Sequence, residues 1–264
     1  MKESSNPLAT LRRRVAGIAG MEHTLQSQRF ATGHGALDIA LGGGLALGRL
    51  HELFAYECDN AASASGFATM LALRARHDGA STLWLRTDEA ERRCGRLFAP
   101  GLVELGGNPD AFLFALAPDV CALLRGAADA ARCAGLGAVI VECWGKSPAL
   151  ELTASRRLAL AAEQSGVTVI MLRIDATPVP SAADTRWAVS AAQSVALEAN
   201  APGPALFEIE LLRRRSGPSG MRWRVEWDRD KCVFREPALS GAVVPLSSHG
   251  SVEAPSAPEL RHIA

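Results

Sequence analysis

The residues best placed for chemistry follow a short apolar stretch, residues 49–55, where the chain turns into a helical run. A strand, a tight loop and a helix in this order form a phosphate-binding loop. Its pattern GxxxxGK(S/T) supplies backbone N–H groups, a lysine for the outer phosphates and a hydroxyl for Mg²⁺. In this chain the two glycine positions hold Ala61 and Gly66, the lysine position holds Phe67, and the hydroxyl position holds Ala68, with Thr69 one residue later. Phenylalanine can neither neutralise phosphate nor donate a hydrogen bond to it. The sequence therefore predicts a nucleotide-binding scaffold that has lost its chemistry and holds no cofactor.

Three carboxylates stand where an ATPase would use them. Glu142 lies near the end of the run AVIVEC, the place of a Walker B carboxylate that holds Mg²⁺. It is compatible with metal binding and also with a carboxylate left after the function was lost, and the missing lysine favours the second interpretation. Asp88 and Glu89 follow an earlier strand, where a carboxylate could activate water. Both would also be favoured there by the dipole of a helix that starts at this point.

A cluster of arginines marks a predicted hairpin. Two alternating segments, residues 206–214 and 221–228, flank the turn sequence SGPSG. The basic residues near its tip are Arg213, Arg214, Arg215, Arg222 and Arg224. One interpretation is a surface that contacts DNA or a protein partner, with salt-sensitive binding. The other is a solvated hairpin whose arginines pair with glutamates across the strands, which the neighbouring glutamates favour.

Apolar runs that alternate with helical patterns must position these residues. Strands are predicted at 49–55, 81–85, 111–115, 138–143, 168–172 and 187–195, and helices at 88–99, 119–134, 149–164 and from residue 66 onward. Strands separated by helices of this length form βαβ units, with right-handed crossovers and a mostly parallel sheet. The predicted fold class is therefore α/β.

The stretch that leads into the loop carries a longer motif. Its members are Thr32, Gly33, Leu37, Asp38, Ala40, Leu41, Gly42, Gly43, Gly44, Leu45, Gly48, Arg49 and Glu52. They resemble TGxxxLDxALGGGLxxGRxxEI, which in the RecA recombinase family runs directly into the ATP-binding loop. The later segments TRWAVSAAQS and WRVEWDRDKCVFRE resemble the ImuA family more narrowly. Together the resemblances imply a RecA-like core with a degenerate phosphate loop and a C-terminal β-hairpin.

Resemblance to the ImuA family also implies a function. It implies a non-enzymatic accessory protein of the SOS-induced mutasome, which supports error-prone translesion DNA synthesis. The implied partners are an ImuB-type polymerase homologue, an error-prone replicative-type DNA polymerase and RecA, with DNA met directly or through them. Two alternatives stay open: a DNA-dependent ATPase of the recombinase type, with Arg49, Arg74 or Arg86 replacing the lysine, and a RecA-like cell-division inhibitor.

The chain of 264 residues divides into a predicted core, residues 31–236, and two flanking segments. In residues 1–30 an amphipathic helix places Leu8, Leu11, Val15 and Ile18 on one face, which either packs on its own domain or docks on a partner. Residues 237–264 are rich in Ser, Pro and Ala and are predicted to be a disordered tail.

Composition narrows the classes of function. Basic and acidic residues number 28 each, so the chain has no global charge to draw it to nucleic acid or a membrane. The six cysteines form no CxxC pair, which favours reduced thiols over a metal site. Without an apolar secretion signal or a long apolar run, a cytoplasmic location is expected.

Overall fold

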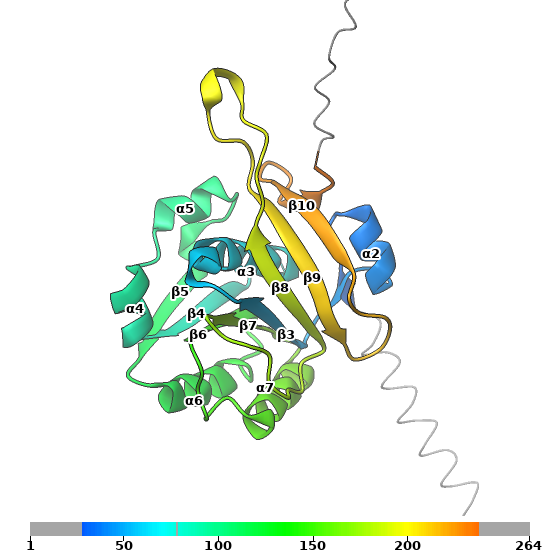
Figure 1. The fold of residues 1–264 in the computed structure, drawn as a ribbon. Coiled ribbons are helices and arrows are strands. Elements are labelled where there is room, and N and C mark those ends of the chain that lie inside the picture. Colours follow the sequence, from blue (N-terminus) through cyan, green and yellow to red (C-terminus); the bar gives the residue numbers. More distant parts are fainter. Residues whose placement is uncertain (1–27, 78, 238–264) are drawn as a thin grey trace, which may run out of the picture.

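The structure, a computed structural model, describes residues 28–77 and 79–237 and is built on a nine-stranded sheet (Figure 1). In spatial order the strands are β11 (Val233–Arg235), β10 (Arg222–Asp228), β9 (Leu206–Arg214), β8 (Thr185–Ala191), β3 (Leu50–Ala55), β7 (Thr168–Ile174), β6 (Leu136–Trp144), β4 (Ser81–Thr87) and β5 (Phe112–Ala117). Neighbours from β8 to β5 pair in parallel, whereas β8 to β11 pair antiparallel. The predicted α/β class with a mostly parallel sheet is confirmed.

Helices cover both faces of the parallel part. One apolar core lies between the sheet and α3 (Ala61–Ala75), and the other lies on the opposite face beneath α6 (Val120–Ala130) and α7 (Leu152–Ser165). Local signals start and stop these helices. The Asp119 carboxylate accepts a hydrogen bond of 2.7 Å from the Ala122 N–H at the start of α6, and Gly166 ends α7 in a left-handed conformation.

The single helix predicted for residues 88–99 is wrong. The structure has α4 (Asp88–Cys94) and, after a break, α5 (Ala99–Glu104). Gly95 interrupts them with φ 75° and ψ −177°, a conformation that no helix can continue. The strand predicted at residues 187–195 also shifts and becomes β8. Its polar first residues are accommodated because Thr185 and Arg186 find buried partners on β3.

The motif before β3 forms a compact lead-in of β1 (Arg29–Phe30), α2 (Gly35–Leu41) and β2 (Leu45–Ala46). Asp38 ties it together by accepting hydrogen bonds of 2.8, 2.8 and 3.0 Å from the Thr32 N–H, the Thr32 hydroxyl and the Gly33 N–H. β1 pairs antiparallel with β2, and a side chain at Gly44 would meet the Phe30 carbonyl oxygen at 2.0 Å. Phe30 is buried and belongs to the core, although a two-residue strand leaves no periodicity to detect in the sequence.

Two predictions fall beyond the described part of the chain. The helical face of Leu8, Leu11, Val15 and Ile18 lies within residues 1–27, and almost all of the predicted tail lies within residues 238–264. Across the described ranges, no helix has the length and apolar character required to cross a bilayer.

Candidate functional site

The segment expected to wrap phosphate is largely helical. After β3 the chain makes a short 3₁₀ turn, Cys58–Asn60, and α3 begins at Ala61 rather than at Gly66 as predicted. All five residues from 61 to 65 are Ala or Ser with no glycine among them, and alanine has the highest helix propensity. Gly66 thus lies within a helix, where backbone N–H groups are used by intrahelical hydrogen bonds.

The residue at the lysine position belongs to the core. Phe67 is 3% exposed, and its ring centroid lies 5.6 Å from that of Phe207 and 5.0 Å from that of Phe234. Ala68 is buried as well. The Thr69 hydroxyl donates to the Ser65 carbonyl at 2.9 Å, one turn back along α3. The side chains at these positions therefore serve packing within α3 and against β9 and β11.

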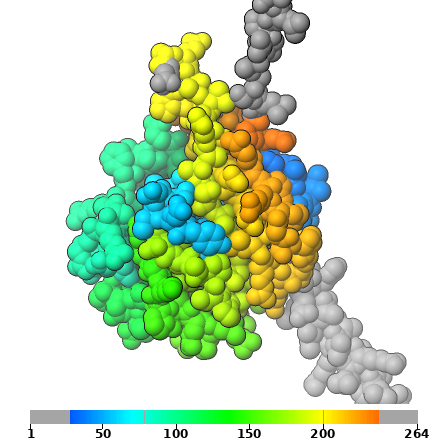
Figure 2. Space-filling view, viewed as in Figure 1, coloured from blue at the N-terminus to red at the C-terminus, as the bar shows by residue number. Residues whose placement is uncertain are grey.

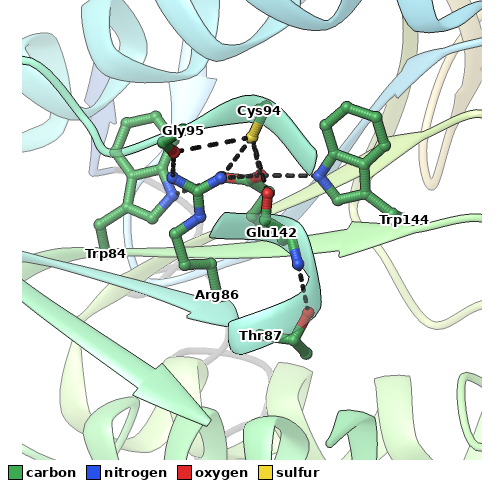
Figure 3. Close-up of polar contacts among 8 residues, drawn as sticks. Trp84, Arg86, Thr87, Cys94, Gly95, Glu142 and Trp144 are labelled. Atoms are coloured by element: carbon green, nitrogen blue, oxygen red, sulfur yellow. Dashed lines mark hydrogen bonds and ion pairs between the residues drawn. The ribbon is translucent and has the colours of Figure 1, made fainter. Parts of the chain in front are cut away.

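Glu142 on β6 sits in a buried polar cluster (Figure 3). Its carboxylate is 1% exposed and accepts hydrogen bonds from the indole N–H of Trp84 at 2.9 Å and of Trp144 at 2.7 Å. The Arg86 guanidinium forms an ion pair with it at 3.3 Å, and Arg86 is itself 3% exposed. The charge of Glu142 is thus neutralised from within the protein.

The outer side of this cluster is formed by α4. Arg86 donates to the Gly95 carbonyl at 3.0 Å and contacts the Cys94 sulfur. Burial, and then the nearby Glu142 charge, raise the pKa of the Cys94 thiol. The Thr87 hydroxyl caps α4 by accepting from the Ala90 N–H at 3.1 Å, so the strand end and the helix start are fixed together.

Of the two carboxylates after β4, Glu89 has local partners. Glu89 forms ion pairs with Arg92 at 2.9 Å and with Arg93 at 3.1 Å, and the hydrogen bonds of these arginines lower the pKa of Glu89. Asp88 lines a cavity of about 360 Å³ together with Glu91, Arg92 and Leu116. Among the described residues, no group of three or more His, Cys, Asp or Glu side chains is arranged to hold a metal ion.

The three arginines considered as replacements for the missing lysine are each engaged elsewhere. Arg49 pairs with Glu163 at 2.5 Å, Arg74 donates to the Ala31 carbonyl at 2.9 and 3.0 Å, and Arg86 pairs with Glu142. These contacts tie them to α7, to the lead-in and to the buried cluster.

The arginines of the hairpin do not share one environment. Arg214 donates to the Ala40 and Leu41 carbonyls at 2.8 Å each, at the end of α2. Arg222 pairs with Glu210 at 2.9 Å, and Arg224 lies opposite Glu208 on β9. Arg213 and Arg215 are exposed. The structure therefore separates the predicted patch into a helix-capping residue, a pair on the β10 face and two solvated residues.

Sequence reasoning missed most of the Glu142 cluster. Trp144 carried a usable signal, because residues two apart on a strand share a face and Trp144 follows Glu142 at that spacing. Trp84 and Arg86 carried none. They come from β4, and only the pairing of β4 with β6 brings them beside Glu142.

Comparison with known proteins identifies the fold to which this geometry belongs. No protein-family model matches the chain. The RadB recombinase crystal structure is similar with a TM-score of 0.53 at 17% sequence identity, covering 79% of this chain and 100% of that one, which identifies the RecA-like fold.

Two curated relatives, each named Protein ImuA, come from the NA1000 / CB15N and the ATCC 19089 / CIP 103742 / CB 15 strains of Caulobacter vibrioides. Each is 33% identical to this chain over 202 residues, which cover 71% of the chain and 72% of the relative. On this similarity, together with the RecA-like fold, the chain belongs to the ImuA family.

Proposed function

We propose that this protein is a RecA-fold accessory factor in damage-induced mutagenesis, and that it acts through protein contacts rather than ATP hydrolysis. Membership of the ImuA family supports the role. The observation that carries the non-enzymatic part is the burial of Phe67 at the lysine position, within an aromatic cluster of the core. Phosphoryl transfer depends on positioned cations around the γ-phosphate, and a core phenylalanine supplies none.

The Glu142 cluster supports the same proposal. A carboxylate that holds Mg²⁺ must present free lone pairs to the ion or its waters. Glu142 instead accepts from two indoles and pairs with Arg86, all within the sheet. Releasing it would leave a buried guanidinium without its counter-charge, which typically costs 3–5 kcal/mol. We infer that this carboxylate stabilises the fold and carries no metal.

The partners we propose are those of the family: an ImuB-type polymerase homologue, an error-prone replicative-type DNA polymerase and RecA, acting in SOS-induced translesion synthesis in the cytoplasm. DNA would be met through these proteins or at the exposed Arg213 and Arg215. The helical face of Leu8, Leu11, Val15 and Ile18 is the proposed docking element, with residues 31–236 as the core and residues 237–264 as a tail.

ATP binding and hydrolysis by the purified full chain, with and without single-stranded DNA, tests the non-enzymatic proposal. Neither binding nor turnover is expected. The matched variants are Glu142→Gln and Asp88→Asn. DNA-stimulated turnover that disappears in either variant would instead assign a recombinase-type ATPase.

Partner choice is tested separately by pull-down with the full chain. The expected preys are the ImuB-type homologue, the error-prone polymerase and RecA, while the division protein that forms the septal ring serves as the control. Capture of the septal protein alone would assign the cell-division alternative.

Deleting residues 1–25 is expected to abolish partner capture and to leave the melting temperature unchanged, since we propose that this segment docks on partners.

A further inference from the structure

The outer edge of β10 is only partly covered. β11 pairs with residues 226–228 of β10. Within the described residues, the stretch 222–225 has β9 on one side and no strand on the other. An uncovered strand edge is a template on which another extended chain can pair.

The backbone direction along β10 identifies the residues that face outward. Met221 accepts from the Leu211 N–H at 2.8 Å, and Trp227 donates to the Ala205 carbonyl at 2.9 Å, so residues 221 and 227 turn toward β9. Hydrogen-bonding direction alternates along an antiparallel strand. Arg222 and Arg224 therefore turn their N–H and C=O groups outward, enough for about four hydrogen bonds to an added strand.

A groove follows this edge. It has a volume of about 1140 Å³, and its walls come from the start of α2, at His34 and Ala36, and from residues 193–196 of the loop after β8. Figure 2 shows the blue residues of α2 beside the orange residues of β10, with the yellow loop projecting at the top of the view, to their left. Trp223, Arg222 and Arg224 line it from β10. The groove thus gives an added strand both a backbone edge and side-chain walls.

Within the residues that the structure describes, β11 stops short of filling this edge. Antiparallel pairing places Arg235 opposite Glu226, so the next residues would run along Val225 and Arg224. The residue that would lie opposite Arg224 is Pro237, which also lines the groove. Proline has no N–H and cannot donate to a ladder. β11 therefore ends where the groove begins.

The charged side chains that line the groove indicate which kind of segment would bind there. Arg222 and Arg224 alternate with Trp223 and point to the same face of β10. The Arg222 side chain is 65% exposed despite its pair with Glu210, and the exposed Arg224 makes one hydrogen bond of 3.3 Å to the Gln193 carbonyl, which leaves other N–H groups of its guanidinium for a ligand. Residues of an added strand opposite the two arginines would share that face, with the residue between them facing the Trp223 side. Glu226, which is ion-paired with Arg235, and Glu236 line the other end of the groove.

We propose that the β10 edge binds an extended segment of a partner protein by strand addition, and that the segment alternates acidic, apolar and acidic residues. Backbone hydrogen bonds to Arg222 and Arg224 supply affinity, and their guanidinium groups supply specificity. The proposal uses none of the residues of the Glu142 cluster or of the loop before α3, so it stands apart from the question of ATP.

Isothermal titration calorimetry on the full chain tests the proposal with a decapeptide centred on Glu-Val-Glu and a control centred on Lys-Val-Lys. The acidic peptide is expected to bind at least about tenfold more tightly, the equivalent of one favourable charge pair. The double variant Arg222→Glu/Arg224→Glu should invert the preference, and Arg213→Glu, off the groove, should leave it unchanged. Equal affinities for the two peptides, or no binding, would overturn the proposal.

Two further measurements separate strand addition from other occupants. Arg224→Pro removes an outward N–H and should abolish binding, whereas Arg224→Gln keeps the N–H and should only weaken it. If Arg224→Pro fails to fold, amide exchange in the wild type decides: the Arg222 and Arg224 amides should exchange freely alone and become protected with peptide. Protection in the free chain would mean that its own residues cover the edge. Binding of oligo-dT at this edge in place of peptide would make it a nucleic-acid surface. Either result refutes the proposal.

Discussion

At the scale of single residues, Phe67 is a buried aromatic side chain at the position that our proposal aligns with the lysine of a phosphate-binding loop. Phe67 lies between Phe207 and Phe234, so it joins α3 to the antiparallel end of the sheet. Its type could be seen in the sequence, and the prediction that it makes no contact with phosphate follows from its chemistry. Its partners could not be seen, because they lie far along the chain on β9 and β11.

Phe67→Ala is expected to lower the free energy of unfolding by about 3–5 kcal/mol, since a buried aromatic ring is removed and a cavity remains. Phe67→Lys should be more damaging, because a charge is then buried without a partner. Urea denaturation followed by far-UV circular dichroism measures both. The matched control is Phe98→Ala, on a side chain 74% exposed, which should change stability by less than about 0.5 kcal/mol. A loss of similar size in the control would contradict this assignment.

His51 on β3 is a second residue whose environment sets a measurable property. It is fully buried, with Nδ1 2.7 Å from the Thr185 hydroxyl and Nε2 2.9 Å from the Ala46 carbonyl. A carbonyl only accepts, so Nε2 carries the proton and Nδ1 accepts from Thr185. Burial lowers the pKa of His51, against the opposing effect of Asp184. The neutral ring is therefore the folded form.

This pKa shift makes stability fall with acid. The unfolded chain takes up the proton first, near pH 6.5, so the contribution of His51 is complete above that pH and declines as the pH drops toward the folded-state pKa. The slope should reach at most about 1.4 kcal/mol per pH unit. Denaturation between pH 7.5 and 5 measures it, and His51→Gln should flatten the curve over this range. An equal slope in both proteins would show that other groups are responsible.

At the scale of elements, the ends and joins of helices and strands were harder to predict than their existence. The buried strands β3, β4, β6 and β7 are mostly apolar runs, which the sequence displays directly, with a few polar residues such as His51 and Glu142 inside them. The start of α3 at Ala61 was missed because the family pattern suggested a loop there, whereas small helix-forming residues prevail. β1 and β2 are two residues each, too short for any period.

Arg214 shows how one element depends on another. Its guanidinium meets the last carbonyls of α2, where the helix dipole is negative. Arg214→Ala should lower the free energy of unfolding by about 1.5–3 kcal/mol, the range for hydrogen bonds to a charged group. Amide exchange at Gly43, which donates to Asp38 at the end of α2, should accelerate. Arg213→Ala should change neither the free energy of unfolding nor the exchange rate at Gly43. An equal effect of the two variants would show that Arg214 does not stabilise the end of α2.

At the scale of the whole molecule, the sheet ends differently at its two sides. The β11 side is bordered by the lead-in, where the Phe234 N–H donates to the Thr32 carbonyl at 2.9 Å. On the other side β5 is the terminal strand of the described sheet, and it exposes Leu113, Phe114 and Leu116 by about half. Charged or proline residues usually blunt such an edge, and β5 contains neither. The sequence shows the apolar run but not its place at the edge.

Leu113→Lys should therefore reduce concentration-dependent self-association, because a charge on an edge strand opposes pairing. Static light scattering over a concentration series measures the second virial coefficient, which should rise. Leu160→Lys on α7 is the control, since both leucines are 51% exposed but Leu160 lies away from the sheet edge. An equal rise in the two variants would attribute the effect to net charge alone.

The carboxylate shared by Trp84 and Trp144 also gives the protein an internal optical probe. Two of its five tryptophans hydrogen-bond to Glu142, so their emission reports on that single group. Under our proposal, adding ATP and Mg²⁺ should leave the fluorescence spectrum unchanged, since the indoles keep their acceptor. Any ion that drew Glu142 away would release both indoles at once and shift the emission wavelength. The protein can thus be assayed for nucleotide without a label.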